Sequence, residues 1–362
     1  MALRFRVSIL LVFICLHLSF QIYSQDRRHQ VNSVISDYRN QLIKYMQDDT
    51  VASLSYAILI DGKIVLSEAL GYADYQDKIK ADTSTIYRIG SITKPITAFL
   101  MMQMIEKDYF KLDDKIEDYL PEVKNLIGYS DSTKITFRQL ATHTSGLPFN
   151  PDNNDASIGP IDKWEDKVIE AIPYTSFKFK PGEKESYSNY GYAILGLAIS
   201  RAVKQPYIDL VYNKIFIPLK MYNSYFIVPD DKINQLSAGT MTKSYEQYKD
   251  VPTMEHKGKG FHVPAGCVYS TPNDFSKFMQ ALMGVSNTKI IRDSTLALMK
   301  SMQIGLGHGG STAGYTALYI IDDKTKNGVI IMRNYFPEYG YRDYTKRFME
   351  ELTRIEKINN GL

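Results

Sequence analysis

Ser91 and Lys94 are the pair of residues whose types and spacing best fit nucleophilic catalysis. A serine hydroxyl is a poor nucleophile until a neighbouring base takes its proton. Residues three apart face the same side of a helix, so we expect Lys94 to lie within reach of the Ser91 oxygen. At the buried N-terminal end of a helix, desolvation and the positive end of the dipole both favour the neutral amine, which is the form that acts as a base.

The element that must hold this pair is a helix that starts at about Ser91. The segment from Ile92 to Ile105 is mostly apolar on every side, which predicts a helix buried all round. Pro95 would clash with the carbonyl of Ser91, four residues back, if both lay inside the helix. A second Ser-x-x-Lys match, Ser286 to Lys289, leads into a strand-like stretch on which positions i and i+3 face opposite ways. The sequence therefore favours Ser91.

Tyr187 and Asn189 can supply the groups that a serine and lysine pair lacks. The pair needs a group that shuttles the proton to the leaving group, and Tyr187 can do this by working as the phenolate beside a positive charge. The Asn189 amide can hold both the lysine and the substrate. Tyr38 and Asn40 repeat the spacing, but Tyr38 belongs to the apolar face of a helix, where core packing is the better interpretation. Tyr187 instead lies in a loop just ahead of a helix, where functional sites usually occur.

A third element is Gly307-His308-Gly309-Gly310-Ser311, just ahead of a predicted strand. Glycines allow a close approach of the backbone to a ligand, so this edge can line a cleft and offer an amide to a developing oxyanion. His256-Lys257-Gly258 also fits His-x-Gly, but it lies in a lysine-rich stretch with no strand after it.

The composition excludes several classes of protein. The chain has 362 residues, a net charge of +3 and two cysteines, Cys15 and Cys267. A near-neutral body argues against nucleic acid or an anionic membrane as the main partner. If Cys15 is removed with the N-terminal segment, an internal disulfide and a cysteine-ligated metal site are both excluded. The histidines have no metal-ligand spacing, and we expect no cofactor.

The N-terminus has the three zones of a secretory signal. A basic segment, Met1 to Arg6, precedes an apolar run from Val7 to Phe20 and then a polar stretch, and we expect cleavage near Ser24. The run is shorter than the roughly 20 apolar residues that span a bilayer, so no stable membrane anchor is expected. Cys15 follows the bulky Ile14, where lipid modification would need a small residue. We therefore predict export, to the periplasm or the medium, of one domain over residues 25–362.

Periodicity predicts an α+β fold. Asp61-Gly62 between two runs of strand formers is a strong hairpin signal. Strands near both ends of the chain suggest one antiparallel sheet closed by the two ends, with a helical region over about residues 100–233 beside it. The predicted strands are 53–60, 63–67, 315–321 and 329–334, and the predicted helices include 31–46, 136 onward, 190–203, 208–216 and 344–358.

The three elements, in this order, resemble the serine β-lactamase and penicillin-binding protein superfamily, with the closest likeness to its class C β-lactamase-like branch. This branch includes D-alanyl-D-alanine carboxypeptidases, D-amino-acid peptidases and lactamase-fold esterases. The resemblance runs from about Ile35 to Asn334. Other phrases that support it are Ser53-Leu54-Ser55-Tyr56-Ala57, Leu140-Ala141-Thr142-His143-Thr144-Ser145-Gly146-Leu147-Pro148, Tyr190-Gly191-Tyr192 and Gly266-Cys267-Val268-Tyr269-Ser270-Thr271.

The resemblance implies a role for each site residue. Ser91 would be the acylated nucleophile, Lys94 its base and Tyr187 the acid/base group. Asn189 would bind the substrate amide, His308 would take the place of the third-motif cation, and the oxyanion hole would be the backbone amides of Ser91 and Ser311. It also implies an antiparallel sheet flanked by the terminal helices, with the site between the sheet and an all-helical region.

One departure bears on the substrate. Many members carry Lys-Thr-Gly or Lys-Ser-Gly as the third motif, whereas His308-Gly309-Gly310 stands there in this chain. Histidine with an ordinary pKa of about 6.5 is mostly neutral at pH 7, so it attracts a substrate carboxylate less strongly than a charged lysine does. We therefore expect a peptide, D-amino-acid amide or ester as the substrate, cell-wall peptide included, with weak β-lactam hydrolysis at most.

Two functions stay open at this point. The chain is either a serine hydrolase or a penicillin-binding or sensor protein of the same fold that is acylated without turnover. Among the remaining candidates, His143 and Ser145 are better interpreted as loop-holding residues than as catalytic ones. Cys267 is better interpreted as a small buried residue.

Overall fold

The computed structural model describes residues 2–49, 51–152, 159–240, 247–248, 260–335 and 341–359. Their contacts divide the chain into two compact units. One unit joins Met1–Asp48 with Tyr339–Leu362, and the other is Asp49–Glu338. The predicted single domain over residues 25–362 includes parts of both units and stays a prediction.

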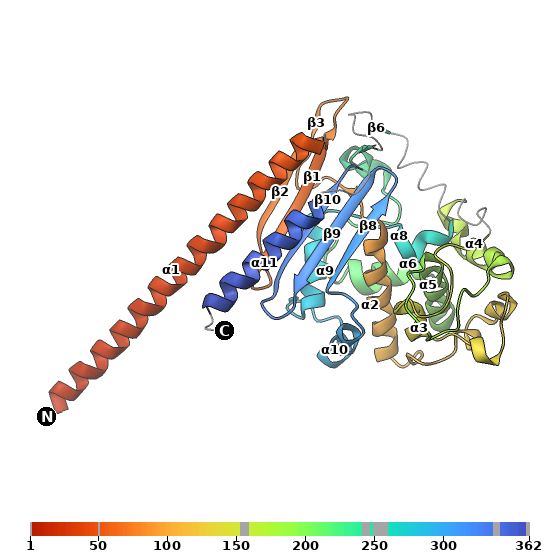
Figure 1. Cartoon of the computed structure of the whole chain (residues 1–362), viewed down its shortest axis with the longest axis horizontal. Helices are drawn as coiled ribbons and strands as arrows, with labels where there is room; N and C mark the ends of the chain where they lie inside the picture. Colours follow the sequence, from red (N-terminus) through yellow and green to blue (C-terminus); the bar gives the residue numbers. More distant parts are fainter. Residues whose placement is uncertain are drawn as a thin grey trace. The chain divides into compact units, whose positions relative to one another are not determined.

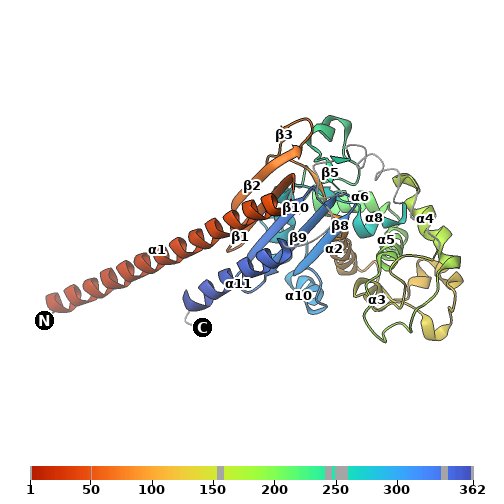
Figure 2. The same cartoon turned by 45° about the horizontal axis from the view of Figure 1, so that its top comes forward.

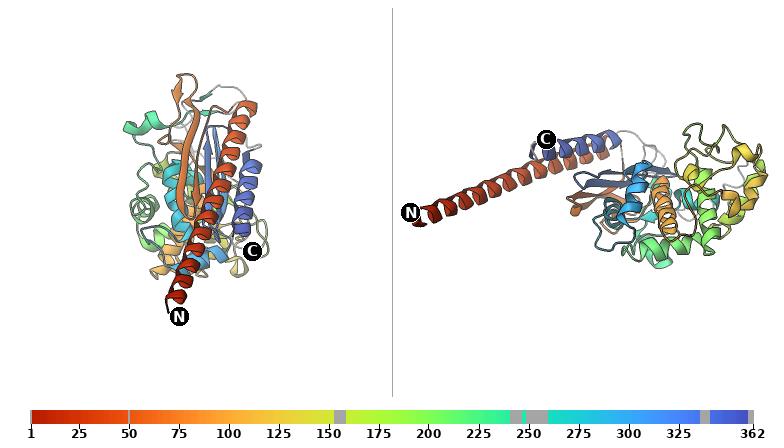
Figure 3. Two further views of the ribbon diagram at one scale, coloured as in Figure 1. Left: turned by 90° about the vertical axis from the view of Figure 1, so that its left-hand side faces the viewer. Right: turned by 90° about the horizontal axis from the view of Figure 1, so that it is seen from below.

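The smaller unit pairs the two terminal helices, α1 (Ala2–Asp49) and α11 (Tyr341–Asn359), which lie side by side in Figure 3. The ring of Tyr38 stacks on Phe348 with centroids 4.2 Å apart, and its hydroxyl lies 2.9 Å from Oγ1 of Thr345. Arg27 and Glu356 form an ion pair at 2.6 Å. The helices predicted at both ends are confirmed, and Tyr38 packs in a core as expected.

The predicted signal segment belongs to the same continuous helix, since α1 begins at Ala2. In the part of the chain that the structure describes, no helix combines the length and the apolar character needed to cross a membrane. Export and cleavage near Ser24 stay predictions.

The larger unit contains a six-stranded sheet in which every pair is antiparallel, in the order β3-β2-β1-β10-β9-β8 (Figure 1). Strand β1 from the start of the chain pairs with β10 from its end, with Leu54 opposite Arg333. The sheet is therefore closed by both ends of the sequence, as predicted. The strands are β1 (Ser53–Ile60), β2 (Lys63–Asp74), β3 (Ile79–Lys80), β8 (Gly307–Thr312), β9 (Tyr315–Asp322) and β10 (Asn327–Arg333).

The hairpin between β1 and β2 turns at Asp61 and Gly62, whose φ angles are 51° and 73°. Two consecutive positive φ angles are what a tight hairpin turn requires, and Asp-Gly adopts them readily. The predicted strand 63–67 is confirmed but continues to Asp74. The Gly307–Ser311 motif was expected just ahead of a strand, but it forms the edge strand β8 itself. The strand was missed because the glycines of the motif hid the strand signal in the sequence.

Helix α9 (Pro272–Met283) packs on β1 and β10, and α2 (Thr93–Glu106) lies beside the sheet with helices α5, α6 and α8 on its other side (Figures 1 and 2). Helix α2 is buried along most of its length, as its apolar sequence predicts. The other α-helices of this unit are α3 (Phe137–Ala141), α4 (Trp164–Ala171), α5 (Asn189–Val203), α6 (Tyr207–Val211), α8 (Val263–Gly266) and α10 (Asp293–Ser301).

Helices and loops fill the described residues between Lys111 and Ile233, which contain no named strand, as predicted. Thr136 caps α3 in a reciprocal pairing with Gln139, so the predicted cap is confirmed. Short 3₁₀ turns are η1 (Gly90–Ile92), η2 (Ile116–Asp118), η3 (Pro121–Asn125), η4 (Asp131–Thr133), η6 (Ile161–Lys163), η7 (Ile172–Tyr174), η9 (Asp230–Gln235) and η10 (Gly260–His262), and a π-helical turn, η8, covers Tyr212–Phe216. Two-residue ladders join β4 (Tyr87–Arg88) to β7 (Tyr269–Ser270) and β5 (Gly239–Thr240) to β6 (Gln247–Tyr248).

Candidate active site

Ser91 lies in the 3₁₀ turn η1, directly ahead of α2. Nζ of Lys94 lies 3.2 Å from Oγ of Ser91, so the spacing brings the pair together as predicted. Pro95 is the third residue of α2, a position at which its missing N–H leaves no bond of the helix unmade. The proline thus sets the start of the helix, and with it the place of Ser91.

Lys94 is completely buried. Its Nζ donates to Oδ1 of Asn189 at 2.7 Å and to the carbonyl oxygen of Ala265 at 2.8 Å. Burial holds the pKa of Lys94 well below its usual range, against a smaller upward effect of Cys267. A neutral amine has two hydrogens and one lone pair, and both hydrogens have acceptors here. The lone pair is left for the hydroxyl proton of Ser91.

Asn189 is the first residue of α5, and its side chain forms hydrogen bonds with both Lys94 and the loop residue Asn150. The Oγ of Ser188 caps this helix by accepting from the amide of Gly191 at 2.8 Å. Nδ2 of Asn189 donates to Oδ1 of Asn150 at 3.1 Å, which orients the amide so that its oxygen faces Lys94. Asn150 was missed at the sequence level, because it follows the Leu147-Pro148 phrase with no pattern of its own.

Tyr187 is half-buried beside the lysine. Nζ of Lys94 lies 4.6 Å from the centroid of the Tyr187 ring. The rings of His143, Phe149 and His308 lie 4.5, 5.8 and 6.1 Å from it, measured between centroids. The structure therefore places the phenol of Tyr187 within the same cluster as Lys94 and Ser91.

Strand β8 closes the other side of Ser91. A Cβ on Gly310 would lie 1.9 Å from the carbonyl oxygen of Ile89, so only glycine allows the strand to approach the η1 turn this closely. A Cβ on Gly90 would lie 2.8 Å from the amide nitrogen of Ser311. The backbones around Ser91 and Ser311 are thus in direct contact, and His308 lies on the same strand. All seven predicted site residues meet in one unit.

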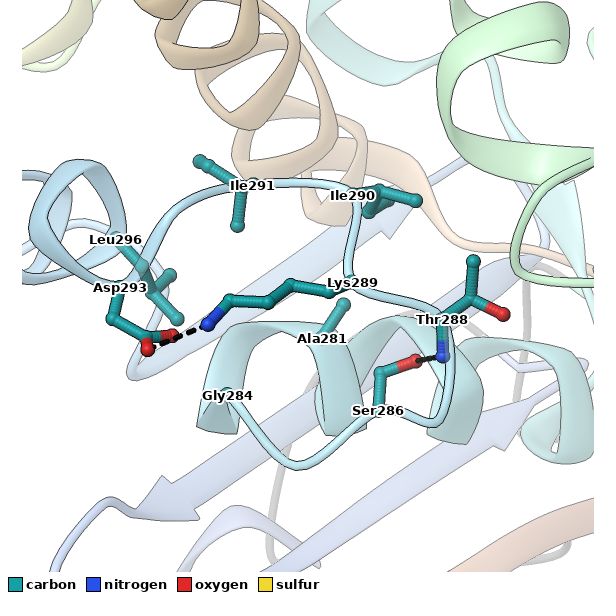
Figure 4. A pocket seen from close by; sticks show the side chains of 9 residues that line it. All are labelled: Ala281, Gly284, Ser286, Thr288, Lys289, Ile290, Ile291, Asp293 and Leu296. Atoms are coloured by element: carbon teal, nitrogen blue, oxygen red, sulfur yellow. Dashed lines mark hydrogen bonds and ion pairs between the residues drawn. The ribbon is translucent and has the colours of Figure 1, made fainter.

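The competing motifs do not form such a cluster. Ser286 to Lys289 lies in the loop that follows α9, which ends at Gly284 with φ at 76°, and Ile290-Ile291, expected to be strand-like, belongs to no named strand. Nζ of Lys289 pairs with Asp293 at 2.6 Å, and Oγ of Ser286 accepts from the amide of Thr288. These residues line a small pocket (Figure 4). The His256 motif lies outside the described residues.

The two other sequence candidates, Cys267 and Ser145, are both buried. Cys267 is buried, with Sγ 3.6 Å from Nη2 of Arg88. Ser145 is buried, and its Oγ accepts from the amide of Leu147 at 3.4 Å. Within the described ranges, no group of three or more histidine, cysteine or acidic side chains is placed to hold a metal ion.

A family model described as Beta-lactamase matches residues 39–354. Among curated proteins, "Beta-lactamase-like protein 4" of Dictyostelium discoideum is 29% identical over 82% of this chain and 54% of its own length. "Protein flp" of Staphylococcus aureus (strain N315) is 26% identical over 84% of this chain and 64% of its own length. The chain thus spans between about half and two-thirds of these relatives.

Solved structures share the fold at lower identity. An octameric penicillin-binding protein homologue from Pyrococcus abyssi has a TM-score of 0.72 at 21% identity, covering 88% of this chain and 77% of its own. A D-alanine carboxypeptidase, AmpC, from Burkholderia cenocepacia has a TM-score of 0.69 at 19% identity, covering 88% and 99%. A beta-lactamase/D-alanine carboxypeptidase from Yersinia pestis has a TM-score of 0.72 at 20% identity, covering 89% and 98%. The predicted α+β fold is confirmed.

Proposed function

Because the chain belongs to the beta-lactamase family, we propose that it is a serine hydrolase that forms a covalent acyl-enzyme on Ser91. Its substrate is a peptide, a D-amino-acid amide or an ester. The observation that carries the proposal is the set of contacts of Lys94. Both its acceptors, the Asn189 side chain and the Ala265 carbonyl, are uncharged, and the upward effect of Cys267 on the pKa of Lys94 is smaller than that of burial, which keeps the amine neutral.

Acylation follows from this arrangement. Lys94 takes the hydroxyl proton of Ser91 as Oγ attacks the substrate carbonyl carbon. The amides of Ser91 and Ser311 stabilise the negative oxygen that develops. Tyr187 gives its proton to the departing nitrogen or oxygen, and Lys94 returns the serine proton to the phenolate. The products of this half are an acyl-serine and the free amine or alcohol.

Water then completes the turnover. A water molecule attacks the acyl carbonyl carbon while Tyr187, with Lys94, accepts its proton. The tetrahedral intermediate collapses with departure of the Ser91 oxygen, which takes a proton back. The acid product leaves, and the site regains its starting protonation state.

The groups near Ser91 favour an acyl donor without an essential carboxylate. Tyr187 has three rings around it, those of His143, Phe149 and His308. The position that holds lysine in many relatives is His308, so no permanent cation stands there. The solved relatives named as D-alanine carboxypeptidases support a peptide ending in D-alanine as one candidate. The N-terminal segment supports export, where a cell-wall peptide would be met.

Intact-mass measurement tests the nucleophile. Wild-type protein and Ser91→Ala are incubated with a fluorophosphonate probe and, separately, with a penicillin. Ser286→Ala is the matched control, because it removes the serine of the second Ser-x-x-Lys match. We expect an adduct in wild type and Ser286→Ala and none in Ser91→Ala. No adduct in folded wild-type protein would overturn the assignment.

Turnover separates the hydrolase from the sensor. Hydrolysis of a short acyl ester and of a D-Ala-D-Ala peptide is followed with the same three proteins. We expect turnover of at least one substrate by wild type and Ser286→Ala. An adduct without turnover of either substrate would contradict the hydrolase and favour a penicillin-binding sensor.

A further inference from the structure

We propose that His143 is the positioning residue of Tyr187, holding the backbone on both sides of the tyrosine and one face of its ring. The inference rests on the proposed function, in which Tyr187 transfers the proton to the leaving group. It assigns His143 a part in the reaction that goes beyond holding a loop.

His143 accepts hydrogen bonds from the residues on both sides of Tyr187. The amide of Ser186 donates to the carbonyl oxygen of His143 at 2.8 Å, and the amide of Ser188 donates to Nδ1 of His143 at 3.1 Å. The imidazole also lies against the phenol, with ring centroids 4.5 Å apart and planes at 30°. His143 therefore fixes the peptide unit that joins Tyr187 to Ser188 and the one that ends at Ser186, and these two bonds restrain the direction in which the Tyr187 side chain leaves the backbone.

The backbone of His143 is strained, which indicates that the surrounding structure imposes its position. Its φ angle is 58°, in the left-handed region that costs a non-glycine residue on the order of 1 kcal/mol. The surroundings supply the restraint. The amide of Gly182 donates to the carbonyl oxygen of Thr144 at 2.7 Å, and that of Lys178 to the carbonyl oxygen of Gly146 at 2.8 Å. A series of backbone bonds thus ties the His143 loop to the loop that ends in Tyr187.

Close contact between the two loops supports the same interpretation. A Cβ on Gly146 would lie 2.2 Å from the carbonyl oxygen of Phe179, so the loops leave no room for a side chain there. Asn189, which bonds Lys94, follows Ser188 at the start of α5. We call the contacts of His143 with Ser186, Tyr187 and Ser188 the clamp. A shift of the clamp would therefore move Tyr187 and disturb the start of the helix that holds Asn189.

The clamp needs an unprotonated Nδ1, because that atom accepts a hydrogen bond from an N–H group. Burial lowers the pKa of His143 to about 3, with smaller downward effects of Lys94 and His308. The neutral ring carries its hydrogen on Nε2, since Nδ1 is the acceptor. The imidazole is thus a stable acceptor and a flat surface for the phenol at neutral pH.

Two variants separate the acceptor from the backbone strain. Asparagine and glycine both tolerate a positive φ, but only asparagine offers a side-chain oxygen close to the place of Nδ1. His143→Asn therefore retains the acceptor, whereas His143→Gly loses it without adding strain. Both keep the carbonyl that accepts from Ser186.

Hydrogen exchange of the peptide covering residues 182–190 tests the clamp without any reaction. We expect about tenfold faster exchange at the Ser188 amide in His143→Gly and near wild-type exchange in His143→Asn. Equal exchange in wild type and His143→Gly would overturn the clamp. This readout stands even if wild type proves to have no turnover, so the two proposals fail separately.

Leaving-group dependence tests the role in proton transfer. A poor leaving group needs a proton from Tyr187, whereas nitrophenolate does not. For His143→Gly we expect kcat/KM to fall about 30-fold with an ethyl ester and less than threefold with the nitrophenyl ester of the same acid, within the about 100-fold or more that a general acid contributes. His143→Asn should recover most of the loss.

A double-variant cycle tests whether His143 acts through Tyr187. If His143 acts through Tyr187, His143→Gly costs no further activity in a Tyr187→Phe background. Equal losses on both esters, or additive losses in the double variant, would show that His143 only supports folding. Rates are divided by the probe-titrated concentration of Ser91, so that unfolded protein does not count.

Discussion

Nζ of Lys94 lies 2.7 Å from Oδ1 of Asn189, closer than the 3.2 Å that separates it from Oγ of Ser91. The amide of Asn189 thus decides which way the amine turns. Because Asn150 accepts a hydrogen bond from the other end of that amide, the bonds from Asn150 through Asn189 to Lys94 hold Nζ beside Oγ of Ser91.

Lys94→Arg should abolish rapid acylation. Arginine stays protonated at any working pH, so it cannot take the proton of Ser91. We expect the burst rate with a nitrophenyl ester to fall at least about 100-fold, the range that a general base contributes. Lys289→Arg, which changes the lysine of the second Ser-x-x-Lys match, should leave the rate unchanged. Rapid acylation by Lys94→Arg would mean that another group is the base.

The buried amine should make folding stability depend on pH. The pKa of Lys94 lies well below its usual 10.5 in the fold, so the unfolded chain binds one more proton between the two values. Stability therefore rises with pH in that window, by at most about 1.4 kcal/mol per pH unit for one proton. Urea unfolding from pH 6.5 to 9 should show wild type gaining on Lys94→Met. Parallel curves would contradict the neutral amine.

Asn189→Asp should move the acid limb of the kcat/KM profile to higher pH. A carboxylate at hydrogen-bond distance from Nζ favours the ammonium form and raises the pKa of Lys94. We expect a shift of about one pH unit or more and about a tenfold lower rate near neutrality. Asn150→Asp places the same charge one side chain farther away and should shift the limb less. The same profile for wild type and Asn189→Asp would show that Lys94 does not titrate in catalysis.

Gly310→Ala should destabilise the fold and slow acylation together. Its Cβ would lie 1.9 Å from the carbonyl oxygen of Ile89, so β8 must move away from the turn that holds Ser91. Overpacking of this kind costs about 3 kcal/mol. Gly266→Ala is the control, since its Cβ would meet atoms no closer than 3.7 Å. Urea midpoints and burst rates measure both effects, and equal stability of the two variants would be contrary to expectation.

His308→Lys should change selectivity in favour of acyl donors that carry a carboxylate. A permanent cation on β8 adds a charge-assisted hydrogen bond worth about 1.5 kcal/mol, or about tenfold in kcat/KM. The comparison is between a carboxylate substrate and its methyl ester, with His308→Asn as the neutral control. The prediction fails if lysine changes both substrates by the same factor.

Features that depend on residues close together in the chain could be predicted from the sequence. Ser91 and Lys94 meet because a helix repeats every 3.6 residues, and Pro95 sets where that helix begins. Asp61-Gly62 determined the first hairpin, and Thr136 the start of α3, because turns and caps are made by adjacent residues. The order of the motifs, with strands at both ends, predicted the closed antiparallel sheet.

Features that depend on contacts between distant segments could be seen only in the folded chain. The complete burial of Lys94, which lowers its pKa, comes from packing against α5 and α8, about 100 and 170 residues away in the chain. The contact of β8 with the η1 turn, the orientation of Asn189 by Asn150 and the clamp of His143 on Tyr187 likewise join separate loops. Such contacts leave no period in the sequence, since each is one hydrogen bond or one missing side chain.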